Sequence, residues 1–190
     1  MTGTGLRRVF FALFPPPEVA EHLIALGHNL AGPGGGRMMR LPALHLTLAF
    51  VGSVSSTQID ELIAVGERVK ASTFDLCLDR LGFWPCGGVL WAGCRELPYA
   101  ERRLFELLRD KLQGAGFAVD QQPHVPHVTL ARRVRCAALP RLATPLGWHV
   151  NEFSLIESHL HHAGARYQTL ATFQLDAFPR DTSSEPVGLI

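Results

Sequence analysis

The sequence His45-Leu46-Thr47-Leu48 returns later in the chain as His127-Val128-Thr129-Leu130, and this repeat is the strongest indication of the fold. Each copy lies in an apolar run that is typical of a β-strand, from Leu44 to Val51 and from Val125 to Ala131. Side chains alternate between the two faces of a strand, so each histidine shares a face with the threonine two residues later. The aliphatic residues point to the opposite face and can anchor the strand in a core. Each copy therefore presents one imidazole beside one hydroxyl.

The segments around the two copies also repeat. The apolar run from Val9 to Leu13 precedes the first copy, and the run from Val89 to Gly93 precedes the second. A helical pattern follows each run, and a further strand-like run follows each motif; the helical stretches are 18–30 and 99–112, and the later runs are 74–78 and 153–156. The sequence therefore predicts an internal duplication of a strand–helix–strand–strand unit. Paired about a pseudo-two-fold axis, by analogy with symmetric oligomers, the motifs would face each other across a cleft.

Length and composition are typical of one enzyme-sized domain. The chain has 190 residues, of which 47% are hydrophobic and 18% are charged, so it can bury a sizeable core. The order of the predicted elements gives an α+β protein with two mostly antiparallel sheets, outer helices and a central cleft. We expect a single bilobal domain over residues 1–178 and a flexible tail over residues 179–190.

Turn and cap signals predict the remaining elements. A serine or threonine within residues 55–57 can cap a helix that follows the first motif. Long strands are predicted over residues 73–84 and 88–95, joined by the hairpin signal Pro85-Cys86-Gly87-Gly88. Further strands are predicted over residues 127–133, 149–160 and 166–176.

Composition also argues against several classes of protein. The formal net charge of +1 argues against broad wrapping of long nucleic acid, but it is compatible with a small nucleotide or an RNA end. The four cysteines show no CxxC pair and no zinc pattern, so we expect reduced thiols in a cytoplasmic protein. The apolar run from Val9 to Phe14 is too short for an export signal, and no segment is long and apolar enough to span a membrane. We expect a monomer without a membrane partner.

Two imidazoles with neighbouring hydroxyls suit acid–base chemistry at a phosphate, in which one group takes up a proton and another gives one. Histidine, with an unperturbed pKa of about 6.5, can do either job, so His45 and His127 are the candidate catalytic pair. The hydroxyls of Thr47 and Thr129 can donate hydrogen bonds to the non-bridging phosphate oxygens. No dense carboxylate cluster accompanies the histidines, so a two-metal hydrolase is not indicated. These residues leave open which histidine is the acid.

The paired motifs, with Ala49-Phe50-Val51-Gly52 after the first and Pro126 before the second, resemble the 2H phosphoesterase superfamily. Within it, the chain is most similar to the bacterial and archaeal RNA 2′,3′-cyclic phosphodiesterases, also called 2′-5′ RNA ligases. The resemblance extends from the strand Arg8 to Ala12 as far as Phe153-Ser154-Leu155 and the segment Gly164 to Tyr167. It implies a bilobal α+β fold around a central cleft and no metal or other cofactor.

The resemblance also implies a reaction and residue roles. The reaction is hydrolysis of a 2′,3′-cyclic phosphate, on RNA ends or small nucleotides, to a 2′-phosphomonoester, with reversible 2′-5′ RNA ligation as a further activity. His45 would be the proton donor and His127 the proton acceptor, and Arg132 would make a charge-assisted contact near the phosphate. The basic residues of the stretch 37–42 are candidates for lining the substrate path.

Other aromatic and histidine side chains have less specific interpretations. His159, His161 and His162 form a late cluster that lacks a carboxylate or cysteine at metal-ligand spacing, so we interpret it as a polar strand end near the cleft. Trp84 and Trp91 could stack on a base, but in strands they are more often core or hairpin-packing residues.

Three alternative functions remain open at this point. One is a phosphodiesterase of the same superfamily that acts on another cyclic-phosphate or 2′-5′-linked nucleotide. The second is a catalytically idle protein that binds RNA ends, although pure binding has no need for two titrating groups. The third is a metal-dependent hydrolase that uses the late histidines, which chelator-insensitive activity would exclude.

Overall fold

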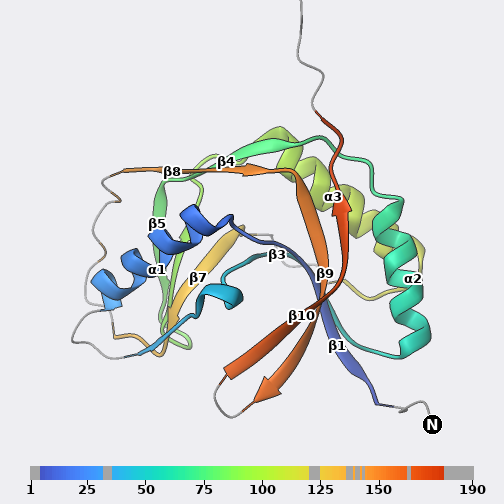
Figure 1. The fold of residues 1–190 in the computed structure, drawn as a ribbon, viewed down its shortest axis with the longest axis horizontal. Helices are drawn as coiled ribbons and strands as arrows, with labels where there is room; N and C mark the ends of the chain where they lie inside the picture. The colour runs from blue at the N-terminus through green and yellow to red at the C-terminus, as the bar shows by residue number, and fades with distance from the viewer. Residues whose placement is uncertain are drawn as a thin grey trace, which may run out of the picture.

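The computed structural model describes residues 5–31, 36–119, 125–135, 139, 142, 144–161 and 164–177. The expected tail over residues 179–190, together with His162, lies outside the described residues. The elements follow in the order β1 (Arg7–Leu13), α1 (Pro17–Ala31), β2 (Arg37–Met38), the short 3-10 helix η2 (Leu41–Ala43), β3 (Leu46–Val54), α2 (Ser56–Glu67), β4 (Phe74–Leu78), β5 (Arg80–Trp84), β6 (Val89–Gly93), α3 (Tyr99–Gly114), β7 (His127–Arg132), β8 (Leu146–Val150), β9 (Glu152–His161) and β10 (Gly164–Gln174) (Figure 1).

The described strands form a large antiparallel sheet and a small one. The large sheet has the order β10-β9-β1-β3-β7-β6-β5, with β2 also paired to β7, and the small sheet pairs β4 with β8. The two halves of the large sheet meet at a single antiparallel Cα pair, Leu46 of β3 with Val128 of β7. These residues hold the same place in the two motif copies, as a pseudo-two-fold axis between the copies requires. The expected α+β class with mostly antiparallel sheets is confirmed.

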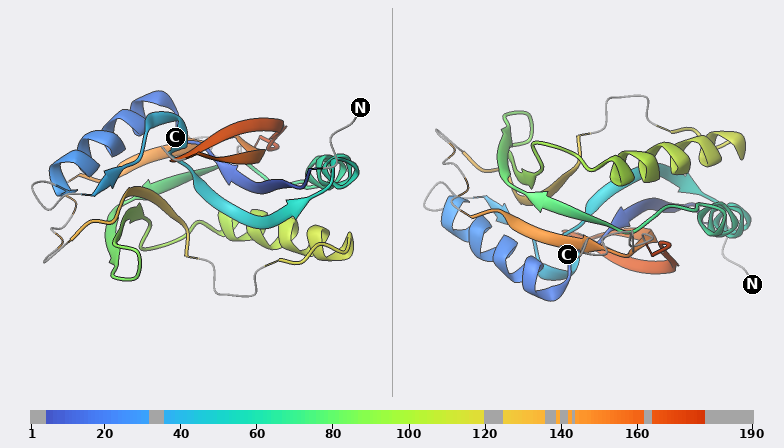
Figure 2. Two further views of the ribbon diagram at one scale, coloured as in Figure 1. Left: turned by 90° about the horizontal axis from the view of Figure 1, so that it is seen from below. Right: turned by 90° about the horizontal axis from the view of Figure 1, so that it is seen from above.

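The two long helices link the two halves of the large sheet, β10-β9-β1-β3 and β7-β6-β5, because each helix packs against strands of the half that does not contain the strand before it in the chain. Helix α1 contacts β7 and β6 of the other half, while α3 contacts β3. Figure 2 shows the two helices on opposite sides of the layer of strands. At Gly27 the approach is close: a Cβ there would lie 3.4 Å from the Cβ of Leu130 and 2.6 Å from Cε of Met38. Because each half covers the motif strand of the other, the halves share one core.

The aliphatic residues of both motifs lie in that shared core, as strand alternation predicts. Leu46, Leu48, Val128 and Leu130 are all buried and belong to the same apolar cluster. This burial fixes the opposite face of each strand, which carries the histidine and the threonine, toward the space between the halves.

Local signals place helix α2 as expected. Ser55 is its N-cap, and its hydroxyl accepts a hydrogen bond from the backbone N–H of Gln58 at 3.3 Å. The Gln58 side chain accepts in return from the backbone N–H of Ser55 at 2.9 Å, which completes a capping box. The helix covers β9 and β10.

The prediction of one continuous strand over residues 73–84 is wrong. The segment is divided at Asp79, because β4 pairs with β8 in the small sheet whereas β5 pairs with β6 in the large one. Asp79 donates its backbone N–H to the carbonyl of Gly93 at 3.1 Å, and its carboxylate accepts from the backbone N–H of Arg95 at 2.9 Å. The strand predicted over residues 149–160 is likewise divided, into β8 and β9 on either side of Asn151.

Candidate active site

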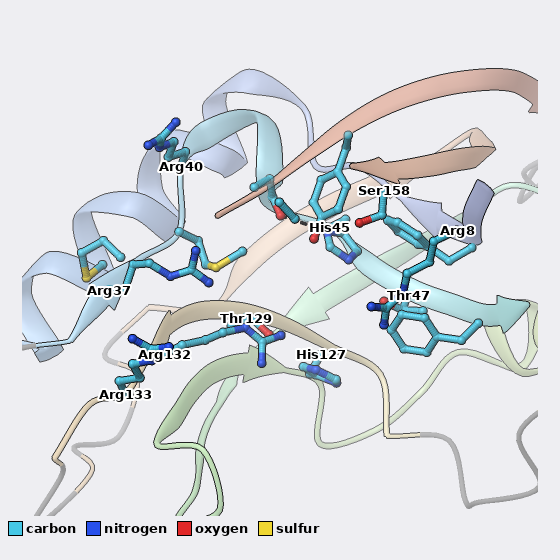
Figure 3. Close-up of a pocket in the computed structure, with 17 residues that line it drawn as sticks. Arg8, Arg37, Arg40, His45, Thr47, His127, Thr129, Arg132, Arg133 and Ser158 are labelled. Carbon is cyan, nitrogen blue, oxygen red and sulfur yellow. Dashed lines mark hydrogen bonds between the residues drawn. The ribbon is translucent and has the colours of Figure 1, made fainter. Parts of the chain in front are cut away.

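A cavity of about 600 Å³ lies where β3 and β7 meet (Figure 3). Its lining residues are Arg8, Phe10, Arg37, Met38, Met39, Arg40, Ala43, His45, Thr47, Phe50, His127, Thr129, Arg132, Arg133, Ser158, Ala165 and Tyr167. The structure thus brings both motif histidines, both motif threonines and Arg132 into one cavity. The basic residues of the stretch 37–42 also line it, as expected from the sequence.

Both imidazoles are held by the same backbone interaction. His45 Nδ1 lies 2.9 Å from the carbonyl oxygen of Ala43, and His127 Nδ1 lies 2.7 Å from that of Val125. A carbonyl oxygen can only accept, so each Nδ1 carries a hydrogen and donates it. In the neutral ring this leaves the lone pair on Nε2, which is then the nitrogen that exchanges a proton. The residue two places before each histidine therefore sets its tautomer.

His45 lies among aromatic rings between η2 and β3. The centroids of Phe10, Tyr167 and Phe14 are 5.0, 5.1 and 5.9 Å from that of the imidazole. Burial lowers the pKa of His45 to about 4, and the positive charges of His127 and Arg132 act in the same direction against the hydrogen bond to Ala43. At pH 7 His45 is therefore neutral.

His127 has its own aromatic support in the other half. The ring of Trp84 meets the imidazole edge-on, with centroids 4.5 Å apart, and Trp91 lies 6.1 Å away. Trp91 packs over Gly82 on the neighbouring strand, where an added Cβ would lie 1.9 Å from the indole. The two tryptophans pack on each other, with centroids 5.2 Å apart, as expected for hairpin residues, but they also position a candidate catalytic group.

The threonines lie on the same strands as the histidines and face the cavity with them. Thr129 is 8% exposed and pairs across the ladder with Trp91, whereas the half-buried Thr47 pairs with Ala12 of β1. The hydroxyls therefore approach the cavity from opposite halves, which is the arrangement needed to hold two oxygens of one phosphate.

Comparison with known proteins identifies the family. The model of the LigT-like phosphoesterases matches residues 13–91. The RNA 2′,3′-cyclic phosphodiesterase of Escherichia coli is 32% identical over 170 residues, which cover 89% of this chain and 97% of that protein. The chain belongs to the LigT-like phosphoesterase family. The protein of the same name from Thermus thermophilus is 32% identical over 180 residues, covering 88% of this chain and 90% of that protein.

The fold of this LigT-like chain also matches a solved relative. The crystal structure of Escherichia coli LigT complexed with 3′-AMP superposes with a TM-score of 0.83 at 32% identity, covering 90% of this chain and 98% of the other. No helix in the described ranges of this chain is long and apolar enough to cross a membrane.

The cavity of this LigT-like chain holds more arginines than the sequence predicts. Arg8, Arg37, Arg40, Arg132 and Arg133 line it, and no described Asp or Glu does. Neither Arg8 nor Arg133 is predicted from the sequence as a cavity residue. For Arg8 a signal existed, because it lies two residues before Phe10 on β1 and therefore shares its face. For Arg133 the strand pattern gave no such signal.

His159, the one late histidine whose side chain is described, is not among the residues that line the cavity. His159 Nε2 is 3.4 Å from the carboxylate of Glu157, which is itself bound by the guanidinium of Arg7. His161 belongs to β9, but its side chain is not among those described. Within the described residues, no three histidine, cysteine or acidic side chains are placed to bind a metal ion together.

Proposed function

We propose that this chain hydrolyses 2′,3′-cyclic phosphates at RNA ends to 2′-phosphomonoesters, with His45 and His127 as the acid–base pair. The observation that carries the proposal is the pair of imidazoles, each fixed through Nδ1 by the carbonyl two residues earlier, in one arginine-lined cavity. Two family relatives are named RNA 2′,3′-cyclic phosphodiesterase, and one relative was crystallised with a nucleotide that carries its phosphate on the ribose 3′ oxygen.

The proposed reaction uses Nε2 of both rings. His127 takes a proton from water as the water oxygen bonds to phosphorus, and the bond from phosphorus to the 3′ oxygen breaks. His45 gives its Nε2 proton to that leaving oxygen, which yields a 3′-hydroxyl and a 2′-phosphate. Thr47 and Thr129 donate hydrogen bonds to the non-bridging oxygens, and the guanidinium of Arg132 offsets their charge. The same steps with the 5′-hydroxyl of a second RNA end in place of water form a 2′-5′ phosphodiester and a 3′-hydroxyl, which is 2′-5′ ligation.

Protonation of His45 at neutral pH requires the bound substrate. Its pKa is lowered to about 4, in part by the positive charges of His127 and Arg132. A phosphate anion in the cavity offsets those positive charges and so raises the pKa of His45. Binding of the substrate therefore favours the protonated form of His45, which is the form that can act as the acid. The direction of transfer, with His45 as donor, follows the family resemblance.

Activity measurements on matched variants test the catalytic pair. His45→Asn and His127→Asn keep a side-chain N–H that can donate to the carbonyls of Ala43 and Val125, but neither can transfer a proton. We expect each to lower turnover of a cyclic-phosphate RNA end by about 10²–10⁴-fold. The control is His22→Asn on α1, an exposed histidine whose Nδ1 lies 2.7 Å from the carbonyl oxygen of Glu18. Near-full turnover by either cavity variant would remove that residue from the mechanism.

A substrate with sulfur in place of the 3′ oxygen tests the direction of proton transfer. A thiolate leaves without being protonated, so this substrate should restore most of the turnover that His45→Asn loses and none of the turnover that His127→Asn loses. Rescue of the His127 variant instead would reverse the two roles. Phosphorus NMR of the product should show the 2′-phosphate alone.

We further propose that the protein acts in the cytoplasm as a monomer. Cys77, Cys86 and Cys94 are free thiols, which fits a reducing compartment. The cavity is complete within one chain, so the proposed chemistry requires no second subunit.

A further inference from the structure

Arg37 and Arg132 face each other at one end of the cavity. They are directly opposed partners in the antiparallel pair of β2 and β7. Directly opposed side chains share a face and have Cβ atoms about 5 Å apart, and two like charges in that position repel each other. Figure 3 shows this pair at the opposite end of the cavity from Arg8, with His45 and His127 between them.

Arg133 joins this pair through an unusual backbone conformation. In a continuing strand, consecutive residues point to opposite faces, so Arg132 and Arg133 could not both line one cavity. Arg133 has a φ of 59°, in the left-handed region that non-glycine residues seldom adopt, and this ends the alternation. Its backbone N–H donates to the carbonyl of Gly87 at 3.0 Å, and the N–H of Val134 donates to that of Gly88 at 3.0 Å. The β5–β6 turn thus holds a strained residue where its side chain reaches the cavity.

The positive charge at this end exceeds what the reacting group needs. Among the described residues, Arg37, Arg132 and Arg133 have no carboxylate partner, and no acidic side chain lines the cavity. A 2′,3′-cyclic phosphate carries one negative charge, and Arg132 alone can offset it. Arg37 and Arg133 therefore remain for a second anion. In an RNA strand the nearest one is the phosphodiester that precedes the terminal nucleoside.

We infer that Arg37 and Arg133, beside Arg132, form a subsite for the phosphodiester that precedes the terminal nucleoside. The preferred substrate is therefore an RNA end of two or more nucleotides rather than a cyclic mononucleotide. This inference rests on the proposed function, because it names the substrate class of the same cavity.

Three substrates that share one terminal nucleoside separate the subsite from the reaction. They are uridine 2′,3′-cyclic phosphate, the dinucleotide UpU with a terminal 2′,3′-cyclic phosphate, and that dinucleotide with an uncharged methylphosphonate linkage. The wild-type kcat/KM for the charged dinucleotide should exceed the other two about 10- to 100-fold, the size of one charge-assisted hydrogen bond. Added salt should reduce this preference.

Matched variants assign the preference to particular arginines. Arg133→Gly removes the guanidinium and accepts the left-handed backbone, so it does not add strain. We expect it, and Arg37→Ala, to bring the ratio of kcat/KM between charged and methylphosphonate dinucleotides close to one. Arg8→Ala removes the same charge from the other end of the cavity and should keep the wild-type ratio.

The outcomes distinguish the two proposals. If the wild-type protein turns over none of the three substrates, the proposed function fails. If it turns over all three with similar kcat/KM, the function stands and the second-phosphate subsite is wrong. If Arg8→Ala lowers the ratio of kcat/KM between the charged and methylphosphonate dinucleotides as much as Arg133→Gly does, the subsite is also wrong. The preference would then arise from the general positive charge of the cavity.

Discussion

The burial of His45 in the cavity should make the free energy of unfolding depend on pH. Burial lowers the pKa of this imidazole from 6.5 in the unfolded chain to about 4 in the folded protein. Between pH 6.5 and pH 4 the imidazole of His45 is protonated in the unfolded state but neutral in the folded state. The free energy of unfolding that His45 contributes is therefore fully present above pH 6.5 and is lost as the pH falls toward 4.

The size of the effect follows from the same two pKa values. At pH 5 this one group should lower the free energy of unfolding by about 2 kcal/mol relative to pH 7. His45→Asn removes the titration while its amide can still donate to the carbonyl of Ala43. In urea unfolding, the wild-type protein should thus lose about 2 kcal/mol more than the variant between pH 7 and pH 5.

NMR titration of the imidazole gives an independent reading. The His45 resonance should titrate near pH 4 in the free protein and at a higher pH in the presence of inorganic phosphate, because the anion favours the charged ring. A midpoint near 6.5 in the free protein, or an equal pH dependence of stability in wild type and His45→Asn, would refute the proposed desolvation of His45.

Three further results are expected. Activity should survive exhaustive treatment with EDTA, since two imidazoles can carry both proton transfers; loss on chelation, restored by a divalent ion, would instead bring His159 and its neighbours into the mechanism. At saturating substrate, where the bound phosphate raises the pKa of His45, the rate should follow a bell-shaped pH profile, broadly between pH 5 and 8. It falls at low pH as the base is protonated and at high pH as the acid loses its proton; a rate that still climbs at pH 9 would exclude an imidazolium acid. Ser55→Ala should lower the free energy of unfolding by about 1 kcal/mol by removing the cap of α2, whereas the exposed Ser56→Ala should change it by less than about half of that, as judged by urea midpoints.

The motif strands could be predicted because their signals are local. Alternation along His45–Leu48 and His127–Leu130 separates a polar face from an apolar one, and the same burial pattern appears in the folded protein. The capping box at Ser55 needs residues only three positions apart, and the aliphatic period of α3 lies within one element. The repeat of the motif then predicted both the duplication and the candidate acid–base pair. These features depend on spacings of a few residues, which a sequence displays directly.

The rest of the site could not be predicted from local patterns, because it depends on pairings between segments that are distant in the sequence. The division of the strand at Asp79 follows from which partner each half of the segment finds, β8 or β6. The opposition of Arg37 and Arg132 is a matter of register between β2 and β7, and Arg133 enters the cavity because the β5–β6 turn holds its backbone. The lowered pKa of His45 likewise requires rings from β1 and β10 to close around it. A net charge of +1 gives no sign of five cavity arginines, because composition sums charges over the whole chain whereas folding decides which of them meet.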